Sequence, residues 1–113
     1  MKVVVAYIKP HRLSDVLLAL HDIEALYGVS VSDIRGFGRG RAKNAPDRVR
    51  EHDMDFVPRV RIETLCPDHV ADQIITTIEK HAHTGLQGDG KIYAVKVDQA
   101  VRISTGERGE SAA

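Results

Sequence analysis

The sequence has little of what usually anchors the core of a small protein. It contains one cysteine, no tryptophan and 4% aromatic residues in a chain of 113 residues. Because Cys66 has no second cysteine to pair with, an internal disulfide is excluded, which favours a reducing compartment. Cys66 lies between Leu65 and Pro67 at the end of an apolar run, so we expect a buried thiol rather than an activated nucleophile.

Net charge of either sign is also absent, since sixteen basic side chains balance sixteen acidic ones. A protein with balanced charges lacks the broad positive electrostatic field that is typical of a general nucleic-acid binder. Two phenylalanines and three tyrosines are too few for the aromatic platform of an RNA-binding domain. No apolar run approaches membrane-spanning length, and the N-terminus lacks the apolar segment of a signal peptide. We therefore expect a soluble cytoplasmic protein without membrane insertion or a nucleic-acid partner.

Apolar side chains recur with the periods of strands and helices along a chain of single-domain length. One domain is expected over residues 1–113. Strands are expected at 2–8, 29–37, 57–66 and 91–97, and helices from 13 to about 27 and from 67 to about 83. The order β-α-β-β-α-β is that of a ferredoxin-like α+β fold, with two helices on one face of a four-stranded antiparallel sheet. The other face needs its own cover, which self-association into a closed oligomer would supply.

A long polar stretch, residues 39–55, separates the second and third expected strands. Long hydrophilic loops in compact domains are generally functional or disordered. The carboxylates of Asp53 and Asp55 have no histidine or serine constellation to complete a catalytic set, and His52 is most simply a solvated side chain. The loop therefore suits docking to a partner protein better than catalysis. The tail at 104–113 is also polar, and we expect it to be frayed.

Three glycines and a lysine precede the fourth expected strand, in the sequence G-L-Q-G-D-G-K of residues 85–91. Glycines let backbone N–H groups approach an oxyanion, and Lys91 adds a compact positive charge, so one interpretation is a phosphate cradle. A tight turn is the simpler interpretation, because the spacing is not that of a Walker A motif. The segment 36–39 and Arg102 are two further features that suit an anion and favour the phosphate cradle, while a bulged strand end and a solvated surface charge are their simpler interpretations.

Histidines are present, but their spacing does not indicate a metal site. His81 and His83 are two residues apart near the end of a helix, and such residues do not share a helical face. A protonated histidine close to a helix C-terminus is the simpler explanation. We expect no metal ligands.

Five motifs, in this order, resemble those of the P-II signal-transduction proteins of nitrogen regulation. They are I-K-P at 8–10, G-F-G-R at 36–39, D-F-V-P-R-V-R-I-E at 55–63, T-G-L-Q-G-D-G-K-I at 84–92 and T-G-E-R-G-E at 105–110. The resemblance extends over essentially the whole chain. It implies a non-enzymatic homotrimer in which ATP and ADP compete for clefts between subunits. It also implies that the loop at 39–55 changes shape with the nucleotide and contacts a regulated transporter or metabolic enzyme.

The resemblance also implies a role for each residue that matches a motif. Gly36, Phe37, Gly38 and Arg39 would lie along the nucleotide. Gly88, Asp89, Gly90 and Lys91 would grip its phosphates, and Leu65 would lie near the base. Ser30, Glu63 and Arg102 would come from the neighbouring subunit or the cleft wall.

Four positions depart from the pattern of the family. Where many members carry a loop tyrosine that is uridylylated, this chain has His52, so that modification is not expected. Gly40 replaces a glutamine that helps to hold Mg²⁺ and 2-oxoglutarate, and Arg59 replaces the lysine that meets the 2-oxoglutarate carboxylate. Ser104 replaces an arginine at the polyphosphate end, which predicts weaker ATP binding and a relative preference for ADP or AMP.

These departures leave a second interpretation open. The protein would then be a specialised P-II-like sensor that binds ADP or AMP, gives no 2-oxoglutarate response and answers to bicarbonate or accompanies metal-linked transport. An enzyme acting on phosphate esters through Lys91 and Arg39 is disfavoured, since no activated nucleophile or base is visible.

Overall fold

The computed structural model describes residues 1–37 and 56–112. Gly38, Arg39, Gly40, His52 and the pair Asp53 and Asp55 lie outside these residues. The described elements, in chain order, are β1 (Lys2–Ile8), η1 (Pro10–Arg12), α1 (Leu13–His21), β2 (Ser30–Gly36), β3 (Val57–Cys66), α3 (Asp68–Ala82), β4 (Gly90–Lys96) and η3 (Gly109–Ala112).

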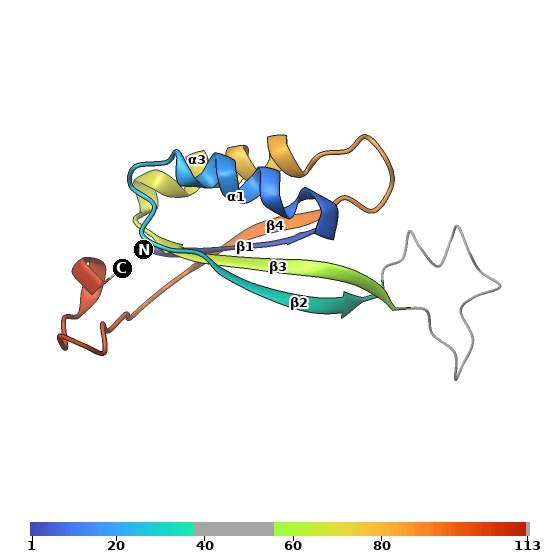
Figure 1. The fold of residues 1–113 in the computed structure, drawn as a ribbon. Helices are drawn as coiled ribbons and strands as arrows, with labels where there is room; N and C mark the ends of the chain where they lie inside the picture. Colours follow the sequence, from blue (N-terminus) through green and yellow to red (C-terminus); the bar gives the residue numbers. More distant parts are fainter. Residues whose placement is uncertain (38–55, 113) are drawn as a thin grey trace.

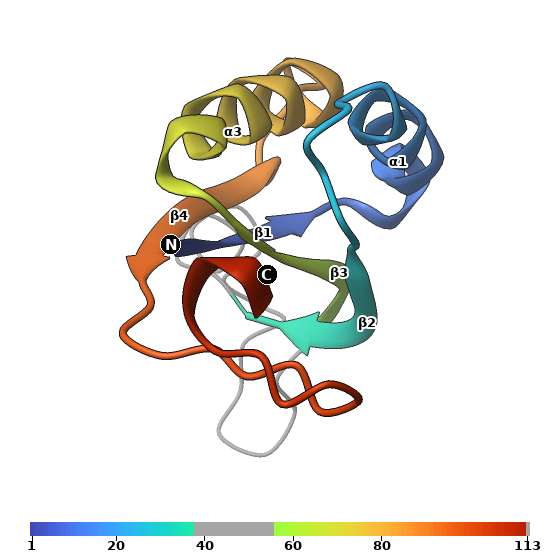
Figure 2. The same ribbon diagram turned by 90° about the vertical axis from the view of Figure 1, so that its left-hand side faces the viewer.

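The strands form one antiparallel sheet in the order β2-β3-β1-β4. Both α-helices, α1 and α3, lie on the same side of this sheet, and no α-helix of residues 1–37 and 56–112 lies on its other side (Figure 1). The view along the sheet in Figure 2 shows the same two layers. The predicted ferredoxin-like α+β fold is therefore confirmed, and the sheet has one covered face and one open face.

The covered face holds the core because strand alternation and helical spacing bring their apolar side chains together. Val4, Ala6 and Ile8 of β1 alternate toward the helices, and the β3 residues from Val60 to Cys66 do the same. The predicted stripe of α3 is buried against them, namely Val70, Ile74, Ile78 and Ala82. Cys66 is buried as expected, and burial raises the pKa of its thiol.

The first helix is shorter than its apolar spacing predicts. α1 ends at His21. Beyond it, the chain turns through backbone hydrogen bonds that span three residues, from the N–H of Ile23 to the carbonyl of Leu20 (3.0 Å) and from the N–H of Leu26 to the carbonyl of Ile23 (3.1 Å). Ile23 stays buried and Leu26 partly buried against the core. The apolar pattern continues beyond the helix because the turns also pack on the core, which explains the wrong boundary.

The tail is also more ordered than predicted, since it folds back on itself. Val101 bridges Arg108, the backbone N–H of Arg102 donates to Glu107 (2.9 Å), and η3 follows. Gly106 has φ of 75°, the left-handed conformation that lets this tight turn close. The expectation of a frayed tail is wrong because backbone bonds, rather than apolar burial, hold it. Among the described residues, no helix is long and apolar enough to cross a membrane.

Candidate functional site

A cavity of about 480 Å³ opens on the face of the sheet without helices. It lies where β2 ends, β3 begins and the glycine-rich turn at 84–90 leads into β4. Its walls are formed by Tyr7, Ile34, Gly36, Phe37, Val57, Arg59, Gly88, Gly90, Lys91 and Tyr93. The cavity therefore combines apolar and aromatic walls with two cations, Arg59 and Lys91.

Strand pairing explains why these residues meet. Tyr7 pairs with Lys91 across β1 and β4, and Ile34 pairs with Arg59 across β2 and β3. Side chains of paired residues stand on the same face of a sheet. Tyr93 stands on this face as well, two residues beyond Lys91 on β4. The open face thus gathers its cations at the end of the sheet from which the segment 38–55 leaves.

The glycine-rich turn approaches the sheet too closely to carry side chains. A Cβ atom at Gly90, whose φ is 107°, would overlap the carbonyl of Tyr7. At Gly88, whose φ is 83°, a Cβ would lie 3.1 Å from Nη2 of Arg59. Both glycines are needed for the backbone to adopt this shape beside Lys91.

Arg59 connects the first residues of β3 to this turn. Its Nη2 donates to the carbonyl of Gly88 (3.1 Å), and its Nη1 donates to the carbonyl of Pro58 (2.8 Å). Its guanidinium group therefore already engages two backbone acceptors at the cavity wall. One side chain therefore joins the start of β3 to the glycine-rich turn before β4.

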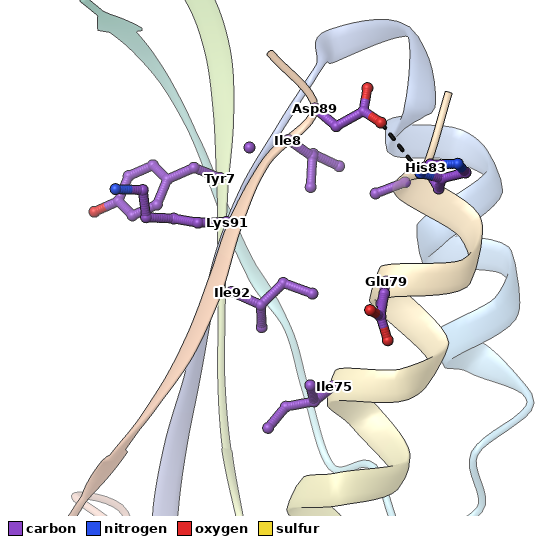
Figure 3. A pocket seen from close by; sticks show the side chains of 10 residues that line it. Tyr7, Ile8, Ile75, Glu79, His83, Asp89, Lys91 and Ile92 are labelled. Atoms are coloured by element: carbon purple, nitrogen blue, oxygen red, sulfur yellow. Dashed lines mark ion pairs between the residues drawn. The ribbon is translucent and has the colours of Figure 1, made fainter. Parts of the chain in front are cut away.

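Asp89 points to the other side of β4 from Lys91. Figure 3 shows its carboxylate directed toward His83 at the end of α3, while Lys91 and Tyr7 project from the opposite side of the sheet. The carboxylate accepts hydrogen bonds from the backbone N–H (2.9 Å) and the hydroxyl of Thr84, and it lies 3.1 Å from Nζ of Lys9. These bonds, those of Thr84 first and then that of Lys9, hold the pKa of Asp89 far below its ordinary value.

Two tyrosines of the cavity wall lie beside an ion pair on the open face. The hydroxyls of Tyr7 and Tyr93 are hydrogen-bonded at 3.3 Å, and Nη2 of Arg61 lies 2.8 Å from Oε1 of Glu63. The bond with Tyr93, followed by that with Arg61, lowers the pKa of Tyr7. The bond with Glu63 raises the pKa of Arg61. This part of the face is polar and hydrogen-bonded within the chain.

The structure brings together some of the predicted site residues and separates others. Gly36, Phe37, Gly88, Gly90 and Lys91 share the cavity with the predicted effector residue Arg59. The other predicted site residues among those described lie elsewhere, and Asp89 points to the α3 side (Figure 3). Ser30 pairs with Glu63 where β2 begins, Leu65 lies farther along β3, and Arg102 lies in the tail, where its Nη1 is 3.4 Å from Oε1 of Glu107.

Several residues at this end of the sheet were not predicted from the sequence to belong to the site. Tyr7, Ile34, Val57 and Tyr93 line the cavity, and Lys9 and Thr84 bind Asp89. Strand alternation could have placed Tyr7 and Tyr93 on one face, but their pairing depends on the register. In the sequence, Lys9 and Thr84 stand out only as members of the motifs I-K-P and T-G-L-Q-G-D-G-K-I, which do not indicate that the two side chains bind Asp89.

A search for metal ligands among residues 1–37 and 56–112 finds no group of three or more histidine, cysteine, aspartate or glutamate side chains. The carbonyl of His81 accepts two bonds from Arg12, and Nδ1 of His83 lies 3.4 Å from Asp89. These two histidines therefore take part in contacts that join α3 to its neighbours.

Comparisons with known proteins agree with this geometry. The sequence profile of the family described as "Nitrogen regulatory protein P-II" matches residues 1–107. The chain is 43% identical to the "Nitrogen regulatory protein P-II" of Haemophilus influenzae and 41% identical to that of Azospirillum brasilense, in both cases over 99% of each chain. It is 40% identical to "Nitrogen regulatory protein P-II 1" of Escherichia coli, again over 99% of each chain.

A solved structure gives the same result for the fold. The structure described as "Arabidopsis thaliana PII bound to citrate" superposes with a TM-score of 0.79 at 37% identity, covering 99% of this chain and 91% of that one. The names of the relatives are those of regulatory proteins and not of enzymes. With the family profile, the full-length relatives and the fold in agreement, the chain belongs to the P-II family of nitrogen regulatory signal-transduction proteins.

Proposed function

We propose that this regulator binds an adenine nucleotide and controls a partner protein through nucleotide-dependent conformations of residues 39–55. The observation that carries the proposal is the cavity in which Gly36, Phe37, Gly88 and Gly90 meet Lys91. Apolar and aromatic walls suit a nucleoside, and a lysine beside a glycine-rich backbone suits its phosphates. Gly38 and Arg39 follow Phe37 directly in the chain, and the proposal keeps for them the nucleotide contacts that the family resemblance implies.

The active form in this proposal is a homotrimer of single-domain chains in the cytoplasm. The open face exposes apolar side chains, with Tyr93 41% and Val95 47% exposed. Ser30, Glu63, Leu65 and Arg102 lie away from the cavity of their own chain, so they would contribute to a nucleotide site only from a neighbouring subunit. A native mass three times that of one chain supports the trimer, and the mass of a single chain contradicts it.

Signalling follows from the position of the segment 39–55. Phe37, before the segment, and Val57, after it, both line the cavity, so a bound nucleotide would contact the chain on both sides of the segment. A ligand shifts a conformational equilibrium only by binding the conformations unequally. The proposed partner, a transporter or a metabolic enzyme, would bind the segment in one of these conformations.

Isothermal titration calorimetry on the purified protein tests nucleotide binding directly. ATP, ADP and AMP are titrated separately, with GTP as the control for base selectivity. We expect ADP or AMP to bind more tightly than ATP, because Ser104 replaces a phosphate-facing arginine of the family pattern. A protein that binds none of the three adenine nucleotides contradicts the proposal.

A second candidate is the specialised P-II-like sensor of another small ligand, bicarbonate or one linked to metal transport. The observation that favours it is Arg59, whose guanidinium already donates to the carbonyls of Gly88 and Pro58. Two of its five N–H donors are thus engaged and hold the guanidinium against the glycine-rich turn, which argues against a family-type 2-oxoglutarate response. Nucleotide-loaded protein is therefore titrated with bicarbonate, 2-oxoglutarate, divalent metals and citrate, the ligand named for the Arabidopsis relative. A strong Mg-ATP-dependent response to 2-oxoglutarate rules this candidate out.

A further inference from the structure

The end of the β1–β4 ladder carries a side-chain network that the proposed site does not use. Nζ of Lys9 lies 3.1 Å from Oδ1 of Asp89 and donates to Oγ1 of Thr84 at 3.2 Å. Thr84 donates to Asp89 through both its hydroxyl and its backbone N–H, and its Oγ1 accepts from the N–H of Leu86 (3.1 Å). The network thus joins the residue after β1 to both ends of the glycine-rich turn.

Its place in the sheet is specific. Ile8 and Gly90 form the last pair of the ladder, and Lys9 and Asp89 are the residues immediately beyond that pair. The ion pair therefore continues the ladder by side chains where the backbone pairing stops. Gly90, with which β4 begins, lies against the carbonyl of Tyr7, so the ion pair is next to the residue that precedes Lys91.

The charges of this network balance each other. The side chains of Lys9 and Asp89 are only 13% and 22% exposed, so each charge lies beside its partner and is largely shielded from solvent. Asp89 points toward the α3 side, away from Lys91 (Figure 3). Within the described residues that line the cavity, Arg59 and Lys91 supply the positive charge.

We infer that Lys9, Thr84 and Asp89 are positioning residues, which hold the glycine-rich turn in the shape that binds anions without touching the ligand themselves. The inference rests on the proposed function and assigns Asp89 a different role from the phosphate contact that the family resemblance implies. It also gives a role to the lysine of the I-K-P motif.

The test compares four variants with the wild type: Lys9→Met, Asp89→Asn, the double variant, and Lys91→Met as a direct ligand contact. ADP affinity is measured by calorimetry at several salt concentrations, and thermal melts check folding. Lys80→Met, which removes an exposed lysine of α3, is the matched control for loss of a positive charge.

We expect each single change at the network to weaken ADP binding by about tenfold and the double variant to lose little more than either single variant, since the effects of contacting partners are not additive. Screening acts on charges that face the ligand, so Lys91→Met should flatten the salt dependence while Lys9→Met should leave its slope unchanged. Lys80→Met should bind like the wild type.

Three results would overturn the inference: wild-type affinity in Lys9→Met, fully additive losses in the double variant, or a flattened salt dependence in Lys9→Met. The last two would indicate that Lys9 contacts the ligand itself. Binding by the wild type separates this failure from that of the proposed function. A wild type that binds no adenine nucleotide contradicts the function, whereas a binding wild type with an unaffected Lys9→Met contradicts only the positioning role.

Discussion

The two faces of the sheet use the same strands for different purposes. The covered face is mainly apolar, with Ile62 and Ile74 fully buried between sheet and helices. The buried hydroxyl of Thr64 on this face donates to the carbonyl of Gly28 (2.6 Å). The open face of the same strands carries Arg59, Arg61 and Lys91 together with hydrogen-bonded tyrosines. Neighbouring residues of one strand thus serve stability and binding separately, because alternation sends them to opposite sides.

This division has a physical consequence for substitutions. Loss of an apolar side chain on the covered face leaves a cavity that the packed layers cannot refill. Loss of a cation on the open face leaves a solvated surface and changes only what that surface attracts. Changes on the two faces should therefore separate folding from ligand binding.

The largest effect is expected from Ile74→Ala on α3. Ile74 is 0% exposed, so truncation should lower the free energy of unfolding by about 2–5 kcal/mol. Urea denaturation measures the change. ADP affinity at a temperature where the variant is folded should stay near that of the wild type, and a large loss of affinity in folded protein would contradict the separation of the two faces.

Gly90→Ala should affect both stability and ligand binding, because Gly90 packs on the backbone of Tyr7 and also lines the cavity. An alanine there has an unfavourable φ and overlaps the carbonyl of Tyr7, which we expect to cost about 2–4 kcal/mol of stability. The displaced start of β4 should also weaken ADP binding. Gly28→Ala, where a Cβ has open space, is the matched control and should change neither property. Equal stability of the two variants would show that β4 can shift without penalty.

Lys91→Met should change binding alone. Loss of a charged contact costs about 1.5–3 kcal/mol, which corresponds to an ADP affinity lower by about 10–100-fold. Calorimetry measures the affinity, and the thermal melt should match that of the wild type. Unchanged affinity would remove Lys91 from the proposed site.

Glu107→Gln in the tail should have a small effect on stability. The pair of Arg102 and Glu107 is half-exposed with the nearest atoms 3.4 Å apart, and such pairs contribute less than about 1 kcal/mol. Urea denaturation should give a midpoint close to that of the wild type. A destabilisation as large as that of Ile74→Ala would mean that the tail belongs to the folded core.

In an acid titration, the loss of the stability that Asp89 contributes should appear only at low pH. Because its pKa is lowered in the folded chain, its contribution to stability is present above the unfolded value of about 3.9 and is lost as the pH falls through the lower folded pKa. The difference in unfolding free energy between the wild type and Asp89→Asn should be constant from about pH 7 to 5 and shrink below about pH 4. Parallel curves down to low pH would show that the network does not hold the carboxylate ionised.

Much of the fold could be predicted from the sequence, since periodicity is a local property. The bounds of β3 and the buried stripe of α3 follow from side chains a few residues apart. The end of α1 could not be predicted, because Ile23 is buried from a turn just as it would be from a helix. The order of the tail depends on backbone bonds across Gly106, which apolar patterns do not report.

The candidate site, like the fold, could be predicted from the sequence only in part. The sequence alone determined which residues are candidates, because glycines and cations in the family motifs are visible in the chain itself. Only the tertiary structure decided that Arg59 bonds to Gly88, that Lys9 faces Asp89, and that Asp89 and Lys91 project from opposite sides of β4. These contacts join residues far apart in the chain, and the register of paired strands, which no local pattern contains, brings them together.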